Sequence, residues 1–366
     1  MSRFSVAKER VLDDLEGIVE ELYRASRKHM RGAIYNVRNP YRPKAKEEQF
    51  AIWLRGARRG AWKDFVSGDH GDAIDLVAFG LTGIVSADSR MTALAWIEDR
   101  YGLKSMDPQT RARAAAEAKS RKLAAEASDK TRREKAIARA RKSFFACRAE
   151  IIGTPVETYL KAERGIPLSA VPNLGRSIRY RPDCEYWMSE SRPRLPAIVT
   201  AMVDGTGRIG ANHHTFLTPD GRAKAGSAEG VLPGKAKLMF PETAGLVMRI
   251  ADGPSGLSAE DAAKAGVKGP VGITEGLEDA LVAALTTPAL RVWAAGSLSG
   301  LMTVPDHAAA SSWIVFKDND WGKPQAKRLF NRAVARLKSF GKPVEVIAVP
   351  ADWGKDLNDA IRSGEW

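Results

Sequence analysis

The segment TEGLEDAL, residues 274–281, begins at the end of an apolar run, and the acidic segments KDND (317–320) and KDLND (355–359) follow later apolar runs. The pattern predicts strands at 271–274, 291–294, 313–316 and 344–349, with helices at 277–285 and 323–340. Strands that alternate with helices form a parallel sheet with helices on its faces. The C-terminal part of the chain is therefore expected to be an α/β domain.

Acidic side chains follow three of these strands. Glu275 follows the first, Asp318 and Asp320 follow the third, and Asp356 follows the last. Because the carboxyl ends of parallel strands share one edge of the sheet, these carboxylates should converge, and like charges that close repel unless a cation lies among them. Oxygen ligands select Mg²⁺ or Mn²⁺.

Each acidic segment also has a simpler reading. Taken singly, an Asp-x-Asp pair is more often a helix cap than a metal site. Asp279 alone would be a solvated helix face, and residues 356–359 alone could be a turn. The three segments in order, each at the end of a strand, favour the metal site.

Residues 274–281, 294–297, 318–322 and 355–359 together resemble the Toprim domain, the catalytic domain of bacterial-type primases, topoisomerases and some nucleases. The resemblance implies a Toprim catalytic domain over 268–366, with Gly276 and Gly322 as glycines that let the backbone turn beside the site. It also implies that Glu275 is a metal ligand or general acid/base and that Asp318 and Asp320 are a metal-binding pair. Asp279 matches the acid of the primase-type variant, and Asp356 and Asp359 match a trailing acidic motif.

Upstream, residues 150–255 contain short strands between Pro- and Gly-rich turns, with a hairpin expected over 195–217. GRIGANHHTFL (207–217) and KAKLMFPETAG (235–245) look like the subdomain that precedes Toprim in primases of phages and mobile elements. Because neighbouring residues of a strand point to opposite faces, at most one of His213 and His214 can face a given site. The residues expected at the nucleotide and template groove are Lys235, Lys237, Arg208, His213 and Lys355.

The net charge of +13 is concentrated in two segments. Twelve Lys and Arg stand against two Glu from Arg24 to Lys63, and twelve against four acids from Pro108 to Lys142. The second segment, within 106–149, is composed of strong helix formers and predicts a long basic helical linker, which could also be a plain spacer. Basic segments of this kind attract nucleic acid, although a solvated surface has the same composition.

The N-terminal region, 1–105, is expected to combine helices with a small antiparallel sheet. AWKDFVSGDHGDAIDLVAF (61–79) is similar to the end of a primase zinc ribbon, but the zinc cysteines are absent and His70 alone cannot hold zinc. No zinc is therefore expected, and the region is either a metal-free relic that binds DNA or a fortuitous likeness. Its candidate DNA-binding residues combine basic and aromatic side chains: Arg55, Arg58, Arg59, Lys63, Trp53 and Trp62.

The two cysteines, Cys147 and Cys184, form no C-x-x-C pair, and no segment has the composition of a signal peptide or a membrane span. A cytoplasmic protein is expected. The leading hypothesis is a primase-like nucleotidyltransferase of a phage, plasmid or integrated element, which uses NTPs and Mg²⁺ to make short RNA primers on single-stranded DNA beside a separate replicative helicase. The alternatives are a Toprim nuclease and a non-catalytic DNA-binding component of a replication or defence complex. The chain contains no G-x-x-x-x-G-K-[ST] motif, which disfavours the nucleases that carry an ATPase.

Overall fold

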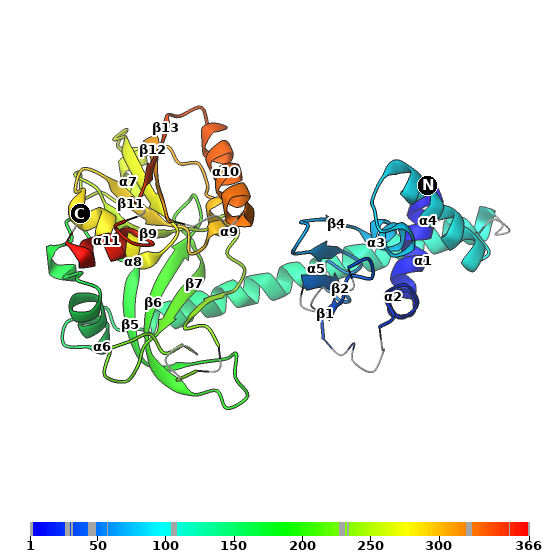
Figure 1. Cartoon of the computed structure of the whole chain (residues 1–366), viewed down its shortest axis with the longest axis horizontal. Coiled ribbons are helices and arrows are strands. Elements are labelled where there is room, and N and C mark those ends of the chain that lie inside the picture. The colour runs from blue at the N-terminus through cyan, green and yellow to red at the C-terminus, as the bar shows by residue number, and fades with distance from the viewer. Residues whose placement is uncertain are drawn as a thin grey trace. The chain divides into compact units, whose positions relative to one another are not determined.

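The computed structural model describes residues 3–25, 30, 32–42, 49–56, 58–103, 108–226, 231–232, 234–319, 324–350 and 352–364. The chain divides into two compact units, Met1–Arg133 and Glu134–Trp366, and the boundary lies within one long helix, α5 (Pro108–Phe145) (Figure 1). This helix confirms the helix expected in the basic linker. None of the helices in the described ranges is both long enough and apolar enough to cross a membrane.

The N-terminal unit packs four helices against a four-stranded antiparallel sheet of order β1-β2-β3-β4, which confirms the expected sheet. The first two helices separate at Asp14. Phe50, Trp62 and Phe79 stack together in the core, with ring centroids 4.8–5.5 Å apart. The elements are α1 (Arg3–Asp13), α2 (Leu15–Tyr23), β1 (Ile34–Val37), β2 (Phe50–Trp53), β3 (Trp62–Asp64), β4 (His70–Gly71), α3 (Ala73–Thr82) and α4 (Ala87–Arg100).

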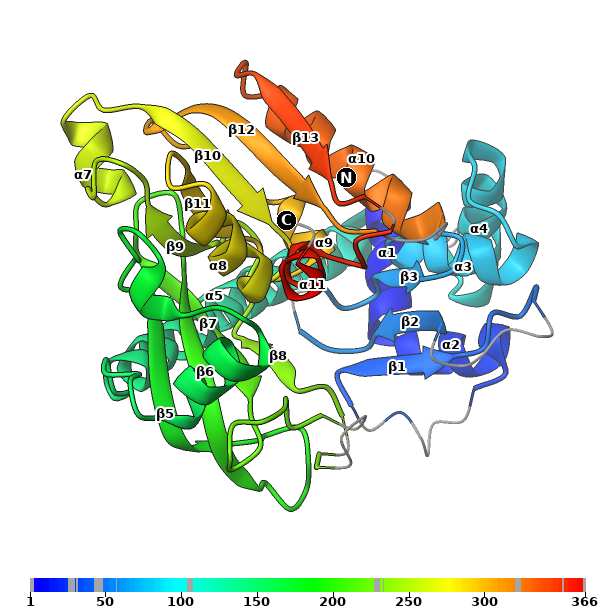
Figure 2. The ribbon, with the colours of Figure 1, turned by 60° about the vertical axis from the view of Figure 1, so that its left-hand side comes forward.

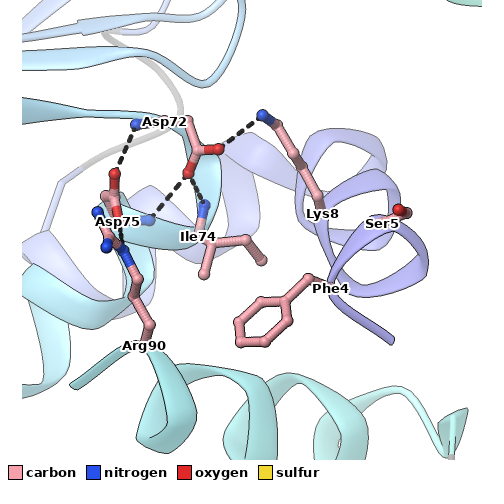
Figure 3. A pocket seen from close by; sticks show the side chains of 7 residues that line it. All are labelled: Phe4, Ser5, Lys8, Asp72, Ile74, Asp75 and Arg90. Carbon is pink, nitrogen blue, oxygen red and sulfur yellow. Dashed lines mark hydrogen bonds and ion pairs between the residues drawn. The ribbon is translucent and has the colours of Figure 1, made fainter. Parts of the chain in front are cut away.

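Asp72 is the N-cap of helix α3. Its carboxylate accepts hydrogen bonds from the backbone of Ile74 and Asp75 and from Lys8 Nζ at 2.6 Å (Figure 3). Asp75 in turn pairs with Arg90 at 2.6 Å, so ion pairs tie α3 to both α1 and α4. A hollow of about 300 Å³ lies between these groups. Because both of its carboxylates are already paired with basic side chains, we assign no ligand to it.

The first sheet of the C-terminal unit is antiparallel, in the order β5-β6-β7-β8, and contains the expected hairpin as β6 and β7. A short helix, α6 (Pro155–Glu157), and the π-helical turn Thr158–Glu163 precede it along the chain. The strands are β5 (Ile178–Glu185), β6 (Arg194–Val203), β7 (Ile209–Phe216) and β8 (Lys237–Phe240).

The second sheet has the order β13-β12-β10-β11-β9 and is the expected parallel sheet, except that β9 pairs antiparallel with β11 (Figure 2). Its strands are β9 (Met248–Asp252), β10 (Gly269–Thr274), β11 (Arg291–Ala294), β12 (Ala310–Lys317) and β13 (Val344–Ala348). Its helices are α7 (Ala259–Lys264), α8 (Leu277–Thr286), α9 (Leu298–Leu301), α10 (Pro324–Lys338) and α11 (Leu357–Ser363).

The two faces of this sheet have separate cores. Leu281 of α8 packs with Val292 and Phe316 on one face, whereas Phe330 of α10 packs with Trp313 on the other. The α8 core also contains Ile198, Met202 and other apolar residues of the first sheet. The two sheets of the C-terminal unit therefore share a hydrophobic core, which places α8 between them.

Candidate active site

The expected acids lie at the carboxyl edge of the parallel sheet. Glu275 is half-buried between β10 and α8, Asp318 directly follows β12, and Asp356 is the N-cap of α11 beyond β13. Asp279, on the first turn of α8, is 6% exposed. Burial, followed by the negative charges of Asp356, Asp318 and Glu278, holds the pKa of Asp279 well above its usual range. The structure thus brings Asp318 and Asp356 within range of the charge of Asp279, and Asp320 lies outside the described residues.

The glycine of the first acidic segment makes room for Asp279. The backbone bends at Glu275 and Gly276 as expected, but Gly276 has a φ of −96°, which any residue can adopt, so the bend itself does not require glycine. A Cβ on Gly276 would instead lie 2.6 Å from Asp279 Oδ2. The glycine therefore allows the acid to fold back against the loop, and Gly322 lies outside the described residues.

A second charged group lies next to Asp279 on α8, and we call it the Glu278 cluster: Glu278, Lys224, Lys237 and Tyr159. The Glu278 carboxylate accepts hydrogen bonds from Lys237 Nζ at 2.7 Å and Tyr159 Oη at 3.0 Å, and Lys224 Nζ lies 3.3 Å away. Burial acts to raise the pKa of Glu278, but the two lysines outweigh it and hold that pKa below its ordinary value. Glu278 therefore remains a carboxylate and fixes two cationic side chains beside the acids.

Arg164 and Asn358 connect this cluster to the acids. Arg164 Nε donates to Tyr159 Oη at 2.8 Å, and Asn358 Nδ2 donates to the Arg164 carbonyl at 2.8 Å. The backbone N–H of Asn358 donates to Asp279 Oδ1 at 3.2 Å. Carboxylates and cations therefore lie side by side in one hydrogen-bonded group.

His213 faces the Glu278 cluster from β7. It is 2% exposed, and burial, followed by the positive charge of Lys237, lowers the pKa of its imidazole to about 3. His214 points to the opposite face, where its ring lies 5.0 Å from that of Trp187. The prediction that only one of the two histidines can face a given site is confirmed.

The other basic residues expected in the groove are not part of the Glu278 cluster. Lys235 is exposed before β8, and Lys355 is exposed beside Asp356, where its carbonyl accepts from the Asn319 backbone at 2.7 Å. Arg208 is in the turn between β6 and β7. Lys237 pairs with Thr215 near the far end of β7, and a strand of that length spans roughly 25 Å. The hairpin therefore holds Arg208 and Lys237 at opposite ends of β7, and the expected contact of Arg208 with nucleotide or template stays a prediction.

Four partners of this site were not predicted from the sequence: Glu278, Lys224, Tyr159 and Arg164. Glu278 could have been recognised from the sequence, because it is an acid within an apolar segment that is expected to be a buried helix. In the structure it is 5% exposed. Such a group requires a counter-charge. The other three come from loops and turns whose sequence does not indicate where they pack.

A cavity of about 440 Å³ lies on the other face of the first sheet. His214 and Phe240 line it from β7 and β8, and Asn212 Nδ2 donates at 2.8 Å to the carbonyl of Ala140 on α5. We call it the arginine cavity, because its lining also includes Arg139, Arg181, Arg192 and Arg194, together with Trp187.

In the N-terminal unit the expected DNA-binding residues separate into two classes. Arg55, Arg58 and Arg59 are exposed in the loop between β2 and β3, where the Arg58 guanidinium lies 4.7 Å from the centre of the Trp53 ring. Lys63 is also exposed, 5.3 Å from the Phe65 ring. Trp62, by contrast, is 1% exposed, so a base cannot stack on it. This corrects the expectation for Trp62, since its strand turns that side chain into the core.

Within the described residues, no three His, Cys, Asp or Glu side chains are close enough together to share one metal ion. The donor set at the carboxyl edge nevertheless fits a hard divalent cation. It consists of carboxylates alone, and one of them is buried among other negative charges. Glu275, Asp279, Asp318 and Asp356 are the described residues that would hold such an ion.

Comparisons with known proteins match two regions of the C-terminal unit. Residues 134–250 match a domain of unknown function, DUF7146, and residues 270–365 match the Toprim domain. A comparison with curated proteins gave no match.

Three solved structures are similar to the chain at low identity. The zinc-binding and RNA polymerase domains of the Aquifex aeolicus primase are 15% identical, with 95% of this chain and 82% of that one covered and a TM-score of 0.37. The primase fragment of the bacteriophage T7 primase-helicase protein is 11% identical, with 90% of this chain and 96% of that one covered and a TM-score of 0.36. A DNA primase domain from Pseudomonas aeruginosa is 16% identical, with 62% of this chain and 74% of that one covered and a TM-score of 0.38. The Toprim match itself covers the acids and the three parallel strands that carry them. Residues 270–365 of this chain therefore form a Toprim domain.

Proposed function

We propose that the C-terminal unit is a primase-type nucleotidyltransferase that copies single-stranded DNA into short RNA from NTPs. The observation that carries this proposal is the juxtaposition of the acids with the Glu278 cluster: Asp279 lies one residue from Glu278, which holds Lys224 and Lys237. A triphosphate that is bound to a metal requires both kinds of group, carboxylates for the cation and fixed cations for its phosphate oxygens.

The roles of the chain's own residues follow from their positions. When bound by the carboxylates, a divalent cation would offset phosphate charge and orient the triphosphate. Lys224 and Lys237 would contact phosphate oxygens, and Glu278 would keep both ammonium groups in place. His213 is neutral at physiological pH, because its pKa is about 3, so it would add no charge to the site.

The template would bind outside the acid cluster. The arginine cavity offers guanidinium groups for the backbone and a partly exposed tryptophan for a base, which is the usual combination in single-strand binding. In the N-terminal unit, residues 1–105 would bind the strand through Arg55, Arg58 and Arg59 beside Trp53. A separate replicative helicase would expose the single strand. The primers would serve the replication of a phage, a plasmid or an integrated element.

The test is primer synthesis by the full chain on unprimed single-stranded DNA with labelled NTPs and Mg²⁺. Short RNA products are expected, and they should disappear in Asp318→Asn and Glu275→Gln. Asp352→Asn, an exposed acid in the loop after β13, is the matched control and should retain activity. Degradation of the DNA would assign the site to a nuclease. DNA binding with neither product would make the chain a binding component and overturn the proposal.

A further inference from the structure

Asp64 is a buried carboxylate with four hydrogen-bond donors. It ends strand β3 and is 1% exposed. Oδ1 accepts from the backbone of Val66 at 2.8 Å and of Ser67 at 3.2 Å, while Oδ2 accepts from Asn39 Nδ2 at 2.7 Å and from the Arg42 guanidinium. A buried carboxylate with this many donors is fully satisfied.

The two oxygens serve two different loops. Oδ1 holds the turn between β3 and β4, and Oδ2 holds the loop that follows β1. Strands β1 and β3 flank β2, and the pairings of Val37 with Phe50 and of Phe50 with Asp64 place their ends at the same edge of the sheet. Asp64 therefore bridges two loops that no backbone ladder joins directly among their described residues.

Asn39, Arg42, Asp64 and Ser67 have the spacing of the ligands in a zinc ribbon. Positions 39 and 42 lie in one loop, and positions 64 and 67 lie in the other, so each pair is separated by two residues. Structural zinc sites of this type use two such ligand pairs, one on each of two adjacent loops.

The residues themselves do not fit zinc. Asparagine and a guanidinium are not ligands that bind zinc in such sites, and both oxygens of Asp64 already accept hydrogen bonds from N–H groups. The exposed His70 contacts the Gly68 carbonyl at 3.1 Å. Both cysteines of the chain belong to the C-terminal unit.

We propose that the network of Asn39, Arg42, Asp64 and Ser67 occupies the place of a zinc site and performs its structural role without a metal. From one of the four ligand positions, the Asp64 carboxylate performs the role of the ion as the group on which both loops converge, with the charges reversed: an anion surrounded by donors replaces a cation surrounded by thiolates. The N-terminal unit then folds, and binds DNA, independently of zinc and of thiol oxidation.

The first test is made on the full wild-type chain. We expect substoichiometric zinc by elemental analysis, and a thermal unfolding curve and a single-stranded DNA affinity that do not change with a zinc chelator or with hydrogen peroxide. One zinc per chain, whose removal unfolds the N-terminal unit, would overturn the proposal.

A second test measures the contribution of the carboxylate. Asp64→Asn leaves Arg42 beside a neutral amide, and backbone amides of β2 and α3 should exchange hydrogen roughly 100-fold faster, as read by mass spectrometry on the full chain. Asp69→Asn, an exposed acid of the same turn, is the matched control and should leave exchange unchanged. Equal exchange in both variants would show that Asp64 does not hold the loops.

The third test asks whether the four positions form a metal cage. A variant with Asn39→Cys, Arg42→Cys, Asp64→Cys and Ser67→Cys should bind one Co²⁺ with the visible absorption of tetrahedral thiolate, and its amides should regain protection when Zn²⁺ is added. The same variant with Ser67 left unchanged should bind the metal at least tenfold more weakly. A four-cysteine variant that gives no cobalt spectrum and stays unprotected in zinc would refute the equivalence.

Discussion

Glu278 accepts a 2.7 Å hydrogen bond from Lys237 Nζ, and this contact joins α8 of the Toprim domain to β8 of the preceding sheet. Lys237 lies within the region that matches DUF7146, and Glu278 lies within the Toprim match. Lys224, from the same upstream region, contacts the other carboxylate oxygen. The charged part of the candidate site is therefore built across the junction of two matched regions.

Glu278→Gln should weaken both stability and substrate binding. The amide keeps the shape of the side chain but leaves two lysines without a counter-charge, at a cost of about 3 kcal/mol, the low end for a buried pair because the lysines are 25% and 36% exposed. Adding Lys237→Met should recover part of that loss in a double-mutant cycle. Urea unfolding checks the stability, and primer synthesis should show an NTP KM raised about tenfold.

The exposed Glu345 of β13 supplies the control for that experiment. Glu345→Gln should leave the urea midpoint and the KM at their wild-type values. Equal stability of the Glu278 and Glu345 variants would contradict the role of the cluster.

Asp279→Asn should stabilise the protein while it abolishes activity. Asp279 is buried beside Asp356, Asp318 and Glu278, so neutralising it removes like-charge repulsion and should add about 1–2 kcal/mol in the presence of EDTA. Mg²⁺ should raise the Tm of the wild type more than that of the variant, because a ligand that binds the folded state stabilises it. Thermal unfolding with EDTA and with Mg²⁺ measures both effects. A variant that is less stable than the wild type in EDTA would contradict this picture.

The features predicted from sequence and those missed differ in how local they are. The strands and acids of the Toprim domain could be predicted, because Glu275 and Asp318 closely follow apolar runs and Asp356 lies in the segment after the last one. Trp62 could not be assigned to the core, since a strand of three residues is too short to show which face is buried. Tyr159 and Glu278 are 119 residues apart, and only the packing of the π-helical turn against α8 brings them together.

His214 should make stability fall on acidification. Burial lowers the pKa of its imidazole to about 4, below the ordinary value of 6.5, so the unfolded chain takes up a proton first as the pH falls. The contribution is complete above pH 6.5 and decreases toward pH 4, by about 2 kcal/mol at pH 5.

The test of that contribution compares two histidines. In His214→Gln the loss of stability between about pH 7 and pH 5 should be smaller by that amount, whereas His70→Gln, which alters an exposed histidine, should follow the wild type. Urea unfolding over this pH range gives the comparison. Parallel curves for all three proteins would mean that His214 does not remain neutral in the fold.

Trp187 and Arg194 should bind the DNA strand in the arginine cavity. Trp187 is partly exposed, and Arg194 pairs with the exposed Asp183 at 3.3 Å, a contact weak enough for a phosphate to replace. Trp187→Ala should lower single-stranded DNA affinity about 10- to 100-fold, because stacking is worth roughly 1–3 kcal/mol per base.

Arg194→Ala should reduce the slope of log K against log salt by about one. Fluorescence anisotropy over a salt series measures both, with Arg332→Ala on α10 as the control, because this exposed arginine is remote in sequence from the cavity residues. If Arg332→Ala reduces affinity as much as Arg194→Ala does, the cavity has no special part in holding the strand and binding follows net charge alone.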